Sequence, residues 1–186
     1  MKTNNNMKQS ILRASTKLIT KTGIKNTSLA DIAKAVGISK GTLYYHYSSK
    51  DDIVCDIADI HLNIVTNAVL TCVQNMKSEN PNNDSVKFIM DKISRIGKTG
   101  RVHMYLICEA ITCNDTLKER IKLKYIEWRT TLKYEIQHTL GHSEKDSEAL
   151  SFLIISIVDG LIVQSLLKTE EIDFESISSF LVDRWI

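Results

Sequence analysis

Residues 28–47 read SLADIAKAVGISKGTLYYHY and contain two short amphipathic segments separated by a glycine. Ser28 is followed three residues later by Asp31, which is the pattern of a capping box at the start of a helix. Gly37 ends this segment after about two turns, and Ser39 is suited to cap the second one. Two short helices joined by a tight turn are typical of a helix-turn-helix.

The second segment extends to Tyr45 or His46 and has a basic and aromatic face. A helix that enters a DNA groove by its N-terminal end offers its first residues to base edges and phosphates. Here Lys40 supplies charge, Gly41 permits close approach of the backbone, and Thr42 supplies a hydroxyl. The side chains that can donate to phosphates are Tyr44, Tyr45 and His46. Alternatively, these aromatic side chains pack in the core, which is what we expect for Tyr47.

Charge is unevenly distributed along the chain. Residues 1–54 contain nine lysines or arginines and three aspartates, a balance of +6, whereas the remainder has fifteen basic and nineteen acidic residues, a balance of −4. A basic segment suits a polyanionic partner. On charge alone, a solvated lysine-rich face explains it equally well, so the argument for DNA depends on the motif.

Apolar residues recur at helical spacing through the rest of the sequence, which predicts an all-α fold of about nine helices. The first helix ends at Thr22-Gly23. A long fourth helix begins after Ser48 and Ser49 and continues to about Met76, and residues 78–84 form a loop around the single proline. Five further helices are expected at residues 85–96, 100–112, 115–140, 145–168 and 173–184.

The stretch SLADIAKAVGISKGTLYYHYSSKDDIV, residues 28–54, resembles the DNA-binding signature of the TetR family of transcriptional regulators. The residues that fit its pattern are Gly37, Ile38, Ser39, Gly41, Thr42, Leu43, Tyr44, His46, Tyr47 and Lys50. The resemblance implies a DNA-binding domain at residues 1–48 and a ligand-sensing and dimerisation domain at residues 49–186. It implies DNA contacts from Thr27, Ser28, Lys40, Gly41, Thr42, Tyr44, Tyr45, His46 and Lys50.

That resemblance also implies a homodimer on a palindromic operator, because two recognition helices must meet half-sites about one turn of DNA, roughly 34 Å, apart. Repression that a small-molecule effector relieves is the usual outcome in the family and is what the resemblance implies, with activation as the alternative. A helical adaptor that has kept the fold but lost DNA binding is the alternative, and the intact recognition segment argues against it.

A candidate ligand site is the stripe of Met104, Cys108 and Ile111 together with Tyr125 and Trp128. Plain core packing explains such a stripe at least as well. Three polar residues beside it are expected at the surface: His103, Tyr105 and Glu109. In residues 115–140 one buried stripe is expected, formed by Leu117, Ile121, Tyr125, Trp128, Leu132 and Ile136.

The helix expected at residues 145–168 is apolar almost all round and therefore needs cover on more than one side. A second copy of the chain is the simplest cover, and in the TetR family the last two helices form such a dimer interface. The residues expected there are Leu153, Ile157, Leu161, Gln164, Ile177 and Leu181. Ser156 and Gly160 are small enough to allow close approach of a partner helix.

Several function classes have little support in the sequence. The four cysteines match neither a metal knuckle nor a disulfide framework, and Gly141 separates His138 from His142, so we expect no metal. There is no phosphate-binding loop, triad or paired-carboxylate motif, so we expect neither a cofactor nor catalysis. Without a signal-peptide pattern or an uninterrupted apolar run of membrane length, the expected location is the cytoplasm, with no membrane partner.

Overall fold

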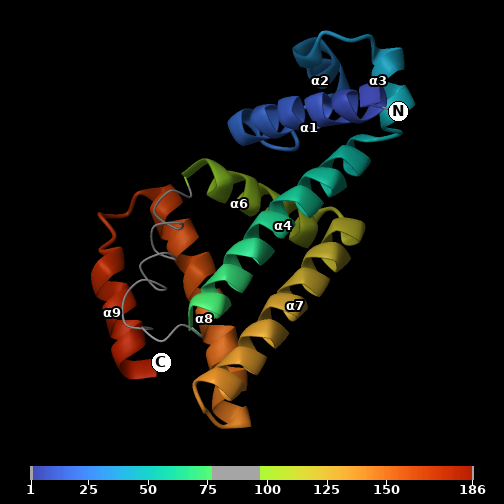
Figure 1. Cartoon of the computed structure of the whole chain (residues 1–186). Coiled ribbons are helices and arrows are strands. Elements are labelled where there is room, and N and C mark those ends of the chain that lie inside the picture. The colour runs from blue at the N-terminus through green and yellow to red at the C-terminus, as the bar shows by residue number, and fades with distance from the viewer. Residues whose placement is uncertain (1, 77–96, 186) are drawn as a thin grey trace. The chain divides into compact units, whose positions relative to one another are not determined.

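The computed structural model describes residues 2–76 and 97–185, and in these residues the regular structure is entirely helical (Figure 1). The elements in chain order are α1 (Lys2–Thr22), α2 (Leu29–Val36), α3 (Lys40–His46), α4 (Lys50–Met76), α6 (Gly97–Thr112), α7 (Asp115–Thr139), α8 (Glu144–Leu167) and α9 (Phe174–Trp185). The predicted all-α fold is therefore confirmed.

Predicted and observed helix bounds agree to within a residue or two except at α6. The prediction began this helix at residue 100, but it begins at Gly97. A glycine in a helix costs about 1 kcal/mol relative to alanine but does not prevent the helical conformation. Gly97 and Gly100 therefore made the start of α6 appear later in the sequence than it is. The loop expected at 78–84 and the helix expected at 85–96 lie outside the described residues.

The chain divides into two compact units. The first contains Met1–Leu62 and Arg101–Ile121, and the second contains Asn63–Gly100 and Lys122–Ile186. In the first unit, α2 packs against α1 and α3 packs against α2; Figure 1 shows the three helices together. The fully buried side chains that join them to the start of α4 are Ile11, Ile19, Ile32, Leu43 and Ile53.

Residues 101–121 complete the first unit by packing side chains from α6 and α7, among which Leu106 and Leu117 are almost completely buried. His103 was expected at the surface, and this was wrong: it is 4% exposed, with its Nδ1 3.0 Å from Nε2 of the buried His61 on α4. The N–H of one imidazole donates a hydrogen bond to the ring nitrogen of the other, so each ring satisfies a polar atom that burial would otherwise leave unpaired. Burial and the neighbouring imidazole lower the pKa of His61 to about 4.

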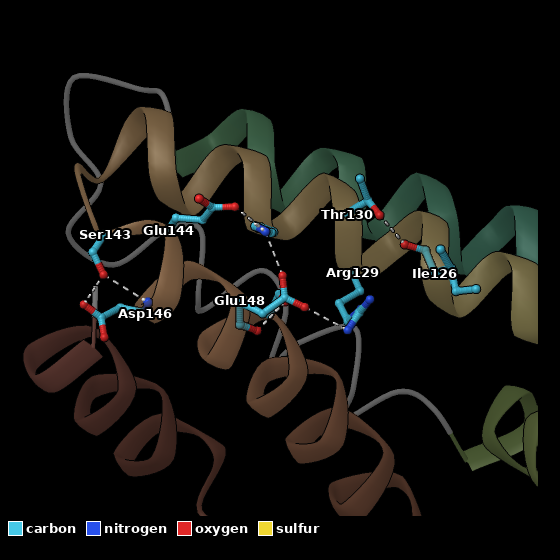
Figure 2. A network of polar contacts seen from close by, with 9 residues as sticks. Ile126, Arg129, Thr130, Ser143, Glu144, Asp146 and Glu148 are labelled. Atoms are coloured by element: carbon cyan, nitrogen blue, oxygen red, sulfur yellow. Dashed lines mark hydrogen bonds and ion pairs between the residues drawn. The ribbon is translucent and has the colours of Figure 1, made fainter.

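The second unit is organised around the C-terminal part of the apolar stripe of α7, in which Trp128, Leu132 and Ile136 are buried as predicted, whereas Tyr125 is only half-buried. Leu132 and Ile136 pack against three residues of α8, namely Leu150, Ile154 and Ile155. Figure 2 shows the polar network beside this contact, in which Arg129 and Lys133 of α7 bind Glu144 and Glu148 of α8. Gly141 has a φ of 75° and turns the chain between the two helices, as its position after α7 predicted.

Helix α8 also packs against the chain's own α9. Leu161 is 7% exposed and contacts Ile157, Val158, Ile172, Phe174, Ile177 and Leu181. Four of the six residues expected at a dimer interface therefore contribute to packing within one chain, while Leu153 and Gln164 are exposed. Helical periodicity shows that a face is apolar but does not show whether it packs against the same chain or against a partner.

By average hydropathy, α8 is long and apolar enough to cross a membrane, and it is the one such helix among the described residues. Polar residues interrupt every apolar run in this helix, but they are too few to lower its average hydropathy below that of a membrane span. Length and composition alone do not distinguish a membrane span from the core helix of a soluble protein. Only 17% of the apolar stretch is buried in the chain.

The low pKa of His61 predicts how stability depends on pH. A histidine with a pKa of about 6.5 in the unfolded chain and about 4 in the folded chain binds more protons when unfolded. The free energy of unfolding should therefore fall as the pH is lowered from about 6.5 to about 4. The contribution of His61 to this fall is up to about 3 kcal/mol. Urea unfolding followed by circular dichroism at a fixed protein concentration measures this.

Comparison with His61→Gln isolates that contribution, because the other titrating groups are shared. The variant should lose less stability than the wild type over the same pH range. His138→Gln, which removes an exposed histidine, is the matched control and should follow the wild type. Equal pH slopes for the wild type and His61→Gln would contradict the assignment.

Candidate nucleic-acid interface

Local hydrogen bonds determine where α2 begins. Ser28 is the N-cap residue: its Oγ accepts from the amide of Asp31 at 3.1 Å, while its own amide donates to Oδ2 of Asp31 at 3.0 Å. The hydrogen bonds from Ser28 also lower the pKa of the Asp31 carboxyl. The predicted capping box is therefore present, and it fixes the start of the first motif helix.

The turn between α2 and α3 depends on Gly37, whose φ of 78° lies in the left-handed region. Its amide donates to the carbonyls of Ala33 and Lys34, which closes the end of α2. Ser39 then caps α3 by accepting from the amide of Thr42 at 3.0 Å. These contacts, together with the complete burial of Leu43, set the orientation of α3 in the first unit.

The outer face of α3 brings together most of the predicted DNA-contacting residues. Tyr45 is 79% exposed and Tyr44 is 54% exposed. Adjacent exposed aromatic side chains are typical of a surface that binds a partner. The smaller or charged residues on this face, Lys40, Gly41 and Thr42, are also exposed. His46 is half-buried, with its ring edge-on to Tyr45 at a centroid distance of 5.2 Å. The result is an exposed aromatic and basic surface.

Two predicted contact residues have structural partners within the first unit. Thr27 is 2% exposed, and its hydroxyl donates to the carbonyl of Gly23 at 2.8 Å. The ammonium group of Lys50 donates to the carbonyl of Ile24 at 3.0 Å. Thr27 therefore closes the loop between α1 and α2 on itself, and Lys50 ties that loop to the start of α4. A DNA contact from either residue remains a prediction.

Tyr47 lies at the C-terminal end of α3 and is buried, which confirms the expectation that it belongs to the core. Its hydroxyl donates to Oδ2 of Asp56 on α4 at 2.8 Å, and the ammonium group of Lys8 lies 5.1 Å from its ring centroid. Burial and the Asp56 carboxylate raise the pKa of Tyr47, which keeps the hydroxyl protonated as a donor. Sequence reasoning missed Asp56, because its spacing from Tyr47 matches no local motif.

The residues predicted to bind a ligand do not all fall in the same unit. Met104 is half-buried in the first unit, where Cys108 and Ile111 are exposed. Tyr125 and Trp128 belong to the second unit, with their ring centroids 5.0 Å apart. Among the described residues, no group of three or more histidine, cysteine or acidic side chains is arranged to hold a metal ion.

A capped helix-turn-helix with an exposed basic and aromatic second helix defines a DNA-binding regulator, and the comparisons agree with this class. Residues 11–57 match the family model described as "Bacterial regulatory proteins, tetR family". The resemblance that the motif predicted is therefore confirmed for these residues, which include the helix-turn-helix.

Individual relatives are distant or match only in part. The uncharacterized HTH-type transcriptional regulator YerO of Bacillus subtilis is 23% identical over 97% of this chain and 63% of its own length. IcaR of Staphylococcus epidermidis, named as a negative transcriptional regulator of the biofilm operon icaADBC, is 43% identical over 25% of each protein. The chain thus spans less than two thirds of either relative.

Solved structures share the fold along nearly the whole chain. A putative transcriptional regulator from Saccharomonospora viridis, solved in complex with choline, matches with a TM-score of 0.67 and 19% identity, covering 96% of this chain and 95% of that one. At this identity the similarity establishes the fold alone.

Proposed function

We propose that the protein is a ligand-responsive repressor that binds a palindromic operator as a homodimer in the cytoplasm. The observation that carries the DNA-binding part of the proposal is the exposed surface of α3, where Tyr44 and Tyr45 lie beside Lys40. Solvent-exposed tyrosines are costly to leave without a partner, and their hydroxyls suit phosphate oxygens. The basic balance of residues 1–54 adds attraction to DNA without sequence preference.

Repression is the direction that the comparisons favour, because IcaR is named as a negative regulator. The choline complex of the S. viridis relative supports a small-molecule effector. We place the effector in residues 49–186, the predicted sensing domain, where α4 gives a continuous connection: it begins four residues after α3 ends and continues to Met76. An effector that shifts α4 would change the spacing of two recognition helices. An effector that binds the conformation unable to bind DNA roughly 10⁴-fold more tightly than the other is sufficient to reverse a strongly biased equilibrium.

Dimerisation is assigned to the exposed face of α8. Leu153 is 43% exposed, Val163 is 38% exposed and Leu167 is 69% exposed, and these residues recur at a spacing that places them on one side of the helix. Between them lie Ser156, which is exposed, and Gly160, where an added Cβ would meet nothing within 4 Å. A partner helix packed here would cover the apolar surface that the chain's own α7 and α9 leave exposed.

Replacing the exposed tyrosine tests the DNA-binding surface. Tyr45→Ala should weaken binding to an operator selected from a pool of random duplexes by about tenfold or more, because a phosphate or base contact is lost and no buried side chain changes. Fluorescence anisotropy at two salt concentrations measures the affinity, and analytical ultracentrifugation checks that the oligomeric state is unchanged.

The matched control is Tyr134→Ala, which removes a tyrosine of α7 that is 56% exposed. Its operator affinity should equal that of the wild type. Unchanged affinity in Tyr45→Ala would refute the assignment of α3. Weak, sequence-blind binding by the wild type would instead favour an adaptor that has retained the fold.

Charges on the exposed face of α8 test the dimer. The double variant Leu153→Glu/Val163→Glu should sediment near the chain mass of 21.1 kDa, because like charges would meet across the two-fold axis without a buried counterion. The control Leu123→Glu alters a leucine of α7 that is 63% exposed, and it should leave the mass at twice that value. A dimeric double variant would show that the interface lies elsewhere.

A further inference from the structure

The outward face of α1 carries a row of cations. Arg13, Lys17 and Lys21 recur every four residues and are all exposed, so they lie on one side of the helix. The opposite side is buried in the first unit and is formed by Ile11, Ser15 and Ile19. The basic row, defined as Arg13, Lys17 and Lys21, therefore faces away from the core of that unit.

The basic row has no acidic counterpart. Residues 1–30 contain six lysines or arginines and no acidic residue. In the part of the chain that the structure describes, no carboxylate forms an ion pair with the row, and Arg13 donates instead to the neutral Oε1 of Gln9 at 3.3 Å. Like charges four residues apart repel one another, so this arrangement destabilises an isolated helix. A polyanionic partner would relieve that repulsion.

Helix α7 shows the contrasting arrangement within the same chain. Its Lys124 pairs with Glu127, and its Arg129 and Lys133 pair with acidic residues of α8. Cations interleaved with acids in this way are typical of a helix face that meets only water. The basic row lacks such interleaving, which favours a polyanion over solvent as its partner.

The basic row ends beside a predicted DNA contact. Oγ1 of Thr22, the last residue of α1, lies 3.1 Å from Oγ1 of Thr27, and the side-chain amide of Asn26 donates to the carbonyl of Thr22 at 3.0 Å. Lys21 directly precedes this pair of threonines, and Ser28, which caps α2 and is a predicted DNA contact, directly follows it. The row is therefore continuous with the predicted DNA-binding surface.

The surroundings of the basic row favour nucleic acid over a membrane or a protein. Among the described side chains of α1, residues 6–22, no large hydrophobic one is exposed. A helix that binds a membrane surface inserts apolar side chains, and the centre of a protein interface is also apolar. A phosphate backbone requires only positive charge and hydrogen-bond donors, which the row supplies.

We propose that the basic row binds the phosphate backbone of the DNA flanking the operator, on the same duplex that α3 reads. This inference rests on the proposed function, in which α3 occupies a half-site. Side chains that begin about 6 Å apart along a helix can reach separate phosphates. Phosphate contacts carry no sequence information, so the row adds affinity without changing which sequence is preferred.

The test compares two duplexes by fluorescence anisotropy. One is the shortest duplex that retains sequence preference, and the other extends it by one turn of DNA, about 10 base pairs, on each side. The decisive variant is Arg13→Gln/Lys17→Gln/Lys21→Gln, because glutamine removes the charge and has a similar helix propensity. The wild type should bind the extended duplex at least about tenfold more tightly at low salt. The variant should lose this gain and bind the short duplex as the wild type does.

The salt dependence of binding gives a second readout. Each lost phosphate contact lowers the slope of log affinity against log salt by about 0.9, so the variant should have a slope shallower by up to about 2.7 per head on the extended duplex. The matched control is Lys118→Gln/Lys122→Gln/Lys145→Gln, which removes the same charge from exposed residues of α7 and α8 and should behave as the wild type. Equal losses in the two variants, or no loss in the basic-row variant, would overturn the proposal. Circular dichroism checks that both variants are folded.

Further outcomes separate this inference from the proposed function and from other partners. A wild type without sequence preference, whose gain on the longer duplex still depends on the basic row, would support the row and refute the operator-specific regulator. Sequence preference without that gain would refute the row while the regulator stood. Row-dependent capture of a second duplex by the short operator complex would overturn the same-duplex assignment. Row-dependent binding to phosphatidylglycerol vesicles, with DNA binding unchanged in the variant, would replace DNA by a membrane.

Discussion

A seven-residue helix is too short to be stable in water by itself, and α3 has only seven residues. Its conformation depends on the Ser39 cap, the left-handed Gly37 and the complete burial of Leu43. The cap and the turn lie at the N-terminal end of the helix and Leu43 lies on its inner side, which leaves the outer side free to carry Tyr44 and Tyr45 in exposed positions. The proposed DNA-binding surface is therefore a consequence of how the rest of the first unit holds this short helix.

The same unit also fixes the beginning of α4. Tyr47 donates to Asp56, His61 pairs with His103 of α6, and the guanidinium group of Arg120 of α7 binds Asp59. The last pair is substantially exposed and contributes little stability, whereas the first two are shielded from solvent and orient the helix more strongly. Hydrogen bonds with defined geometry thus connect α6 and α4 to the end of α3, which is what the proposed effector response requires.

Local signals in the sequence predicted the motif well because the interactions involved are themselves local. The cap at Ser28, the turn at Gly37 and the end of α7 near Gly141 each depend on residues within four positions of one another. The TetR resemblance was carried by this same segment, and the family comparison confirmed it.

Contacts between residues far apart in the sequence could not be predicted from local sequence patterns. Nothing near His103 in the sequence indicates that it pairs with His61, and nothing near Tyr125 indicates Asp159. The apolar stripe of α8 was recognised, but its division between the chain's own α9 and an exposed face required coordinates. Periodicity identifies which residues avoid water, whereas the tertiary arrangement decides what covers them.

The central claim is that two recognition helices, held by one dimer, read two half-sites on the same face of DNA. Its most direct test is operator affinity after five base pairs are inserted between the half-sites, which turns one of them to the opposite face of the duplex. The account predicts that affinity falls by about a hundredfold or more, while an insertion of ten base pairs is less damaging. Unchanged affinity after the five-base-pair insertion would mean that the two heads bind independently and would contradict the account.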